Sequence, residues 1–171
     1  MHFDPNTCYS HSNGNLLADH LFYVGKLLYN NLNHKKELGF YCGIFHDFGK
    51  VTEYFQKYIQ TKMEGEEALD ISAEDKTHTA ISILFSTWFF AQYLNEEDYN
   101  YIIPIISALN HHSRLIDVNN LFLKLLTGRK TRILQNQIDN LKSRITVLEK
   151  LYKNELVARI DNQLSDPEKE K

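Results

Sequence analysis

The segment "YCGIFHDFGK", residues 41–50, ends with three side chains that could do chemistry. His46, Asp47 and Lys50 follow an apolar run that is typical of a buried helix. Burying an unpaired charge costs a great deal of free energy, so these groups need partners. Lys50 follows His46 and Asp47 by one helical turn and would share their face, where its ammonium could hold an anionic substrate or stabilise a transition-state oxyanion. Each residue alone also has an ordinary explanation, such as a carboxylate that caps a neighbouring helix or a solvated lysine at a helix end.

Other polar side chains also interrupt apolar helical patterns. His20 lies on a stripe with Leu17 and Leu21, and His78 opens the apolar stretch 77–94. A lone histidine on such a face is more often a hydrogen-bonded core residue than a ligand. One shared metal centre would satisfy all of these groups at once, because neutral imidazoles and carboxylates are ligands that divalent transition metals prefer. The residues that we expect to hold metal are His20, His46, Asp47, His78, His111, His112 and Asp161.

The helices that must position these residues follow from hydrophobic periodicity. Apolar residues recur with helical spacing over 16–32, 36–60, 77–94, 96–115 and 117–128, with Gly128 as a plausible C-cap, and no strand alternation stands out. A heptad pattern over 134–152 predicts a long amphipathic helix that packs on its own domain, with a surface for a partner helix as the alternative. The sequence therefore predicts an all-α fold, a compact helical bundle with a long amphipathic C-terminal helix. We expect one domain over residues 1–164 and a disordered tail over 165–171.

Composition and charge narrow the possible functions. The net charge of -3 gives no global field that would attract nucleic acid, so any such contact must be local. Cys8 and Cys42 lie far apart and form neither a disulfide framework nor a zinc-ribbon pattern. No apolar run reaches the length of a membrane span, and the first residues show no secretion signal. We therefore expect a cytoplasmic protein that does not contact the membrane.

The ordered histidines and aspartates resemble those of the HD superfamily of metal-dependent phosphohydrolases, which are all-helical. "HDFGK" looks like the central motif of that superfamily. Within it, the pattern most resembles the HD nuclease of CRISPR type I interference, which occurs fused to a helicase or as a stand-alone subunit. "YSHSNGN" with "LADHL" resembles that family's opening segment and first-helix histidine, and "THTAIS" resembles its helix-opening histidine. "NHHSRL" resembles its tandem histidines, and "ARIDNQLSD" resembles its closing aspartate. Ser113 stands where the family more often has a glycine.

The resemblance implies a dinuclear centre in which Asp47 bridges two divalent ions, with manganese, nickel, cobalt, iron and magnesium as candidates. One ion would be bound by His20, His46, Asp47 and Asp161, and the other by Asp47, His78, His111 and His112. Asp47 and Lys50 would be the catalytic residues for hydrolysis of phosphodiester bonds in DNA, single-stranded by resemblance, with a metal-activated water. The chain carries no helicase apparatus, so a helicase subunit and the rest of a CRISPR effector complex would be separate chains.

Contacts with the substrate are expected near the metal centre. Basic residues gather after the double histidine and could line a phosphate track, although a solvated helix end explains them equally well. His11 belongs to the segment that resembles the family's opening. The residues that we expect to contact the substrate are His11, Arg114, Arg129 and Lys130.

Three other functions fit parts of this pattern. An HD-type nucleotide phosphohydrolase is the main alternative, and the tandem histidines favour the nuclease over it. A cyclic-dinucleotide phosphodiesterase of the HD-GYP type shares the HD-x-G-K box, but this chain lacks Gly-Tyr-Pro after the double histidine. A binding scaffold that has lost catalysis is the non-enzymatic alternative, and the presence of every expected type of ligand residue argues against it.

Overall fold

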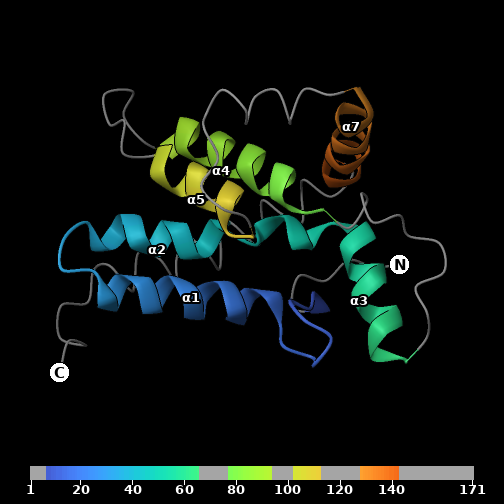
Figure 1. Cartoon of the computed structure of the whole chain (residues 1–171), viewed down its shortest axis with the longest axis horizontal. Helices are drawn as coiled ribbons and strands as arrows, with labels where there is room; N and C mark the ends of the chain where they lie inside the picture. Colours follow the sequence, from blue (N-terminus) through green and yellow to red (C-terminus); the bar gives the residue numbers. More distant parts are fainter. Residues whose placement is uncertain (1–6, 66–76, 94–101, 113–127, 143–171) are drawn as a thin grey trace.

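The computed structural model describes residues 7–65, 77–93, 102–112 and 128–142, and most of these residues are helical (Figure 1). The described part of the chain contains no strand, only an isolated bridge between Tyr9 and Leu16. The predicted all-α fold is therefore confirmed. The helices are α1 (Leu17–Asn31), α2 (Lys36–Phe45), η2 (Phe48–Val51), α3 (Glu53–Met63), α4 (Thr79–Tyr93), α5 (Ile102–Asn110) and α7 (Gly128–Lys142), of which η2 is a 3-10 helix.

Helices α1 and α2 lie side by side along the long axis of the molecule (Figure 1). The two backbones approach closely where Gly25 of α1 faces Gly43 of α2, because a side chain at Gly43 would overlap the backbone of Gly25. This close packing matters for the polar residues. His20 of α1 is brought within hydrogen-bonding distance of His46, which caps the end of α2.

An aromatic core fixes α4 against α2 and η2. Phe45 at the end of α2 is fully buried, and its ring centroid lies 5.1 Å from that of Phe89 and 5.4 Å from that of Phe90, both on α4. Phe48 of η2 stacks on Phe85 of α4 with ring centroids 3.8 Å apart. Burying each such ring stabilises the fold by about 1.5–3 kcal/mol. Phe45 and Phe48 flank His46 and Asp47 in the sequence, so the core holds the polar segment in place.

The predicted continuous helix over 36–60 is wrong. The chain leaves the α-helix after Phe45, and Asp47 has φ -113° and ψ 10°, which lies in the sparsely populated bridge region of the backbone. The 3-10 helix η2 follows, and Thr52 is extended before α3 begins at Glu53. Hydrophobic periodicity did not reveal these breaks, because apolar residues on both sides of Asp47 are buried.

Within the described residues, the helix predicted over 96–115 ends earlier than expected. Helix α5 covers Ile102–Asn110, and Pro104 stands in its first turn, where a missing N–H costs no hydrogen bond. His111 and His112 therefore follow the helix in a turn instead of continuing it. This ending turns both imidazoles toward Asp47.

Helix α7 is the described part of the predicted C-terminal helix. Gly128, expected to end a preceding helix, instead begins α7. Leu141 is buried, and Leu134 and Ile138 pack against the main core, as expected for packing on its own domain. Residues 117–127, the heptad positions after 142 and the expected tail over 165–171 lie outside the described residues.

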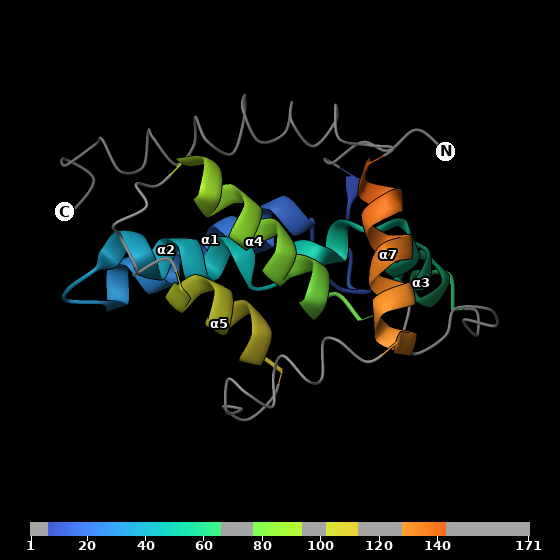
Figure 2. The ribbon, with the colours of Figure 1, turned by 90° about the horizontal axis from the view of Figure 1, so that it is seen from above.

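Polar side chains also anchor α7 to the rest of the bundle. Figure 2 shows α7 near the start of α4, with which it is in contact. Buried Gln137 donates from Nε2 to the carbonyl of Thr77 at 2.7 Å, directly before His78. Asn140 accepts from the backbone N–H of Glu53 at 3.1 Å and donates to its carboxylate at 3.1 Å. Among the described helices, none has the length and apolar character needed to cross a membrane.

Candidate metal centre

Asp47 stands at the centre of a buried polar cluster. Its side chain lies in the break between α2 and η2 and is almost fully buried, with 3 % of the residue exposed. The two carboxylate oxygens face two different groups of side chains. Each group places its ligand atoms within 4.8 Å of one another, and both groups share Asp47.

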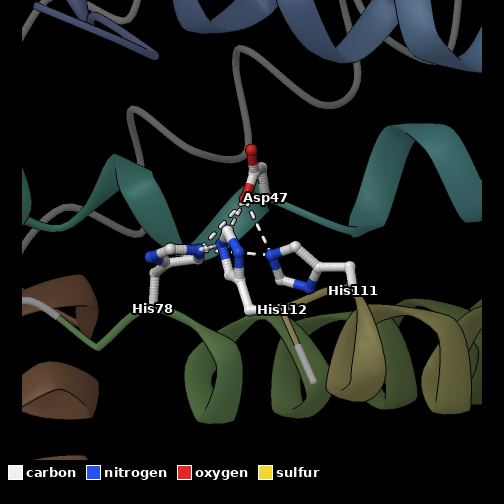
Figure 3. A group of neighbouring side chains, drawn as sticks. All are labelled: Asp47, His78, His111 and His112. Carbon is white, nitrogen blue, oxygen red and sulfur yellow. Dashed lines mark hydrogen bonds and ion pairs between the residues drawn. The ribbon is translucent and has the colours of Figure 1, made fainter. Parts of the chain in front are cut away.

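The Oδ1 side of Asp47 faces three imidazoles (Figure 3). The Nε2 atoms of His78 and His111 each lie 3.0 Å from Oδ1, and that of His112 lies 3.9 Å away. His78 is buried directly before α4, whereas the side chain of His112 remains 61 % exposed. Residues from two distant segments thus converge on one carboxylate oxygen.

The Oδ2 side of Asp47 faces two imidazoles and an ammonium. Nε2 of His46 lies 3.2 Å and Nε2 of His20 lies 3.3 Å from Oδ2. Nζ of Lys50 lies closer, at 2.7 Å, in an ion pair buried on both sides. This side therefore already contains a positive charge in contact with the carboxylate.

Hydrogen bonds at Nδ1 determine what two of these imidazoles present to Asp47. Nδ1 of His46 lies 2.6 Å from the carbonyl of Gly43, and Nδ1 of His111 lies 2.7 Å from the carbonyl of Ala108. A carbonyl only accepts, so each Nδ1 carries the proton and donates it. In a neutral ring, Nε2 then presents a lone pair toward the carboxylate, which is repulsive unless a cation lies between them.

The spacing between nitrogens fits such a cation. Nε2 of His78 lies 3.3 Å from that of His111 and 3.2 Å from that of His112, and Nε2 of His20 lies 3.3 Å from that of His46. Two nitrogen ligands at about 2.0–2.1 Å from a tetrahedral metal are about 3.3 Å apart. The chemistry and the spacing of the donors therefore fit a divalent metal on each side of Asp47.

The protonation of the cluster supports ligand roles. Burial alone would raise the pKa of Asp47, but wherever Nε2 of His111 or of a neighbouring imidazole carries a proton, it donates to the carboxylate and lowers that pKa well below its usual range, so Asp47 stays a carboxylate. Partial burial, followed by the nearby imidazoles of His111 and His78, lowers the pKa of His112. His112 is therefore neutral near pH 7, the form that can bind a metal.

Lys50 lies beside Asp47, as the sequence predicted, and only 5 % of the residue is exposed. Its expected contact with an anionic substrate stays a prediction. Its ammonium contacts Oδ2 of Asp47 at 2.7 Å and donates to the carbonyl of Ser10 at 3.2 Å. In this arrangement it positions the Asp47 carboxylate and ties the N-terminal segment to the site.

The N-terminal segment is held beside the centre by a glutamine that was not among the predicted site residues. Gln56 of α3 accepts from the N–H of Tyr9 at 2.8 Å and donates to the carbonyl of Tyr9 at 2.9 Å and to that of Lys50 at 2.8 Å. A side-chain amide can pair with both polar groups of one residue in this way. The signal in the sequence is a glutamine directly after Phe55 on the buried face of α3.

The held segment brings His11 next to the Oδ2 side. Its ring packs edge-on against His20 with centroids 5.0 Å apart, although His11 itself is exposed. The hydroxyl of Ser10 donates to the carbonyl of Asn15, so Nδ1 of His11 must donate to Ser10 Oγ, 3.0 Å away. The partial burial of its ring, followed by the charges of Lys50 and His20, lowers the pKa of His11. Its Nε2 therefore presents a lone pair beside the site.

A serine links the two sides of the centre. Ser82 of α4 is fully buried and accepts from the backbone N–H of Gly49 at 2.7 Å. A side chain at Gly49 would overlap the carbonyl of His78. The segment after Asp47 therefore packs directly on the start of α4. The sequence shows that Ser82 follows His78 by one helical turn, but it does not show that Ser82 bonds to Gly49.

The structure brings six of the seven expected metal ligands together: His20, His46, Asp47, His78, His111 and His112. The seventh, Asp161, lies outside the described residues, as does Arg114. Arg129 and Lys130 lie in the first turn of α7, but their side chains are not among those described. Their proposed contacts with substrate remain predictions.

Comparisons with family models, with curated proteins and with solved structures found no match to this chain.

Proposed function

We propose that this chain is a metal-dependent phosphohydrolase of the HD type, and within that class a nuclease. The proposal rests on one observation, which is that the two carboxylate oxygens of Asp47 face separate groups of imidazoles. One carboxylate can bridge two cations only if both oxygens have further ligands around them. Here three imidazoles surround Oδ1 and two face Oδ2.

The chain's own residues supply binding and orientation. Asp47 would bridge the two ions, and hydrogen bonds from Nδ1 of His46 and His111 orient their Nε2 atoms for ligation. Asp161 would complete the Oδ2 side. Divalent ions bound there would activate water for attack on phosphorus and polarise a phosphoryl oxygen. Manganese, nickel, cobalt, iron and magnesium remain candidates.

The substrate in this proposal is single-stranded DNA. The tandem histidines and the order of the motifs favour the nuclease of CRISPR type I interference over a nucleotide phosphohydrolase. A helicase subunit and the effector complex would be partners on other chains, acting in the cytoplasm. His112 is exposed beside the Oδ1 side and His11 beside the Oδ2 side, so each could contact a strand that reaches the centre. Arg114, Arg129 and Lys130 would contact phosphates farther along the strand.

The test is an activity panel on metal-stripped protein. Single-stranded DNA, double-stranded DNA, a cyclic dinucleotide and nucleoside triphosphates are incubated with manganese, nickel, cobalt or magnesium, added one at a time. The control variants are Asp47→Ala and Asp139→Ala, of which the second removes an exposed carboxylate on α7. We expect metal-restored cleavage of single-stranded DNA that Asp47→Ala abolishes and Asp139→Ala leaves unchanged.

Other outcomes would contradict the proposal in distinct ways. Turnover of nucleotides alone would keep the metal centre and replace the nuclease with a nucleotide phosphohydrolase. Metal binding without turnover of any substrate would favour a binding scaffold. Cleavage that survives in Asp47→Ala would remove Asp47 from the chemistry.

A further inference from the structure

The two sides of Asp47 differ in formal charge before any ion binds. The ammonium of Lys50 lies 2.7 Å from Oδ2, and both side chains of this pair are buried. Around Oδ1 the described part of the chain places imidazoles only, and no lysine or arginine forms an ion pair with this oxygen. Among the described residues, the charge of the carboxylate is thus already balanced on the Oδ2 side.

Lys50 is held in this position by more than its ion pair. Its Nζ also donates to the carbonyl of Ser10 at 3.2 Å and lies 5.4 Å from the ring centroid of Phe55. A buried ammonium with these partners does not swing into solvent to make room. A cation that arrives at the Oδ2 side must therefore bind beside a fixed positive charge.

We propose that Lys50 makes the two metal sites unequal and sets the order in which they fill. The first ion binds at the Oδ1 side, among His78, His111 and His112. The second binds at the Oδ2 side, where repulsion by Lys50 lowers its affinity. This inference rests on the proposed metal centre, and it makes Lys50 a positioning and affinity-setting residue instead of a contact to substrate.

Lys50 also connects the Oδ2 side to the N-terminal segment. The carbonyl of Ser10 is the second partner of the Lys50 ammonium, and His11 follows directly. A cation on Oδ2 weakens the hold of the carboxylate on Lys50 and leaves the carbonyl of Ser10 as its main partner. Filling of the second site is thereby coupled to the segment that carries His11 beside His20.

The experiment is calorimetric titration of the metal-free full chain with manganese. Wild type is compared with Lys50→Met and Lys50→Gln, which remove the charge, and with Lys50→Arg, which keeps it. Lys57→Met is the matched control, because Lys57 pairs with Glu53 on the exposed surface of α3 and its loss gives the same change in net charge. Circular dichroism confirms that each variant is folded, and His46→Ala identifies which step belongs to Oδ2.

We expect two binding steps in wild type, with the weaker one lost in His46→Ala. Removing the charge at Lys50 should tighten that weaker step at least about tenfold and change the stronger step by less than about threefold. Lys50→Arg and Lys57→Met should keep the wild-type affinities. If Lys50→Met misfolds, a comparison of the weaker step in Lys50→Gln with that in Lys50→Arg tests the same effect of the charge.

Two results would overturn the inference. Two steps in wild type whose weaker affinity is unchanged or reduced in Lys50→Gln would refute the role of Lys50 and leave the metal centre intact. Wild-type protein that binds no manganese, nickel or cobalt would instead refute the metal centre, and the proposed function with it.

Discussion

The Oδ1 and Oδ2 sides of Asp47 belong to one carboxylate but are built from different parts of the fold. The Oδ1 side takes its imidazoles from the start of α4 and the turn after α5. The Oδ2 side takes its groups from α1, the end of α2 and η2, and these include the ammonium of Lys50. Asp47 therefore lies where groups from α1, α2 and η2 meet groups from α4 and α5.

A set of histidines in a sequence does not imply equivalent metal sites. Imidazoles alone surround one oxygen among the described residues, whereas the other oxygen shares its surroundings with a buried cation. Around Oδ1, a divalent ion can bind with no fixed positive charge beside it. Around Oδ2, a divalent ion needs a further anionic ligand to offset Lys50, and Asp161 is the residue that we expect to supply it.

The largest expected effect comes from Asp47, since it belongs to both sides. Asp47→Ala should remove both manganese-binding steps and lower nuclease activity at least about 1000-fold, as expected when a group that serves the whole site is lost. It also leaves Lys50 buried without its carboxylate, which should lower the free energy of unfolding of the metal-free protein by about 3–5 kcal/mol. Calorimetry and urea denaturation measure the two effects. Retention of either binding step would show that the sides are not joined through Asp47.

Substitutions on each side should separate the two halves. His78→Ala should weaken binding at the Oδ1 side at least about 100-fold, above the range typical of a residue that only supports a ligand. His46→Ala should do the same at the Oδ2 side, and each variant should retain the other step. Manganese titrations of both variants test this. Equal loss of both steps in both variants would mean that the centre binds as one unit.

A smaller effect should follow from breaking the link between Asp47 and α4. Ser82→Ala leaves the buried N–H of Gly49 without its acceptor, at a cost of about 1–3 kcal/mol in unfolding free energy. Because Gly49 packs on His78, we expect about tenfold weaker binding at the Oδ1 side, comparable to the loss of a supporting residue.

The matched control for this change lies one helical turn away. Ser86 is equally buried on α4, but its hydroxyl bonds to the carbonyl of Ile83 in its own helix. Ser86→Ala should leave metal binding unchanged. The same loss of metal affinity in both variants would point to a general weakening of α4.

The smallest expected effect on metal binding belongs to His11. It lies beside His20 but outside both groups of clustered ligand atoms. His11→Ala should therefore leave both manganese steps within about threefold of wild type and lower kcat/KM for single-stranded DNA about tenfold, the loss of one substrate contact. Loss of the Oδ2 step in this variant would instead make His11 a metal ligand.

The fold class and the residues that form the cluster around Asp47 could be predicted from the sequence, for two physical reasons. Helical spacing of apolar residues specifies which faces are buried, so the positions of α1, α4 and the described part of α7 could be predicted. Polar residues on those faces must find partners, so His20, His46, Asp47 and His78 could be grouped before their distances were known.

How these residues meet depends on the tertiary structure. Periodicity does not report where a helix stops, so it missed the break at Asp47 and the end of α5 before His111. It also could not show which oxygen of Asp47 faces which imidazoles, or that Lys50 is buried against Oδ2. These features depend on contacts between segments far apart in the chain, such as Gly49 with Ser82 and Lys50 with Ser10. Local spacing determines the face of a helix, whereas the packing of separate helices determines the surroundings of a single atom.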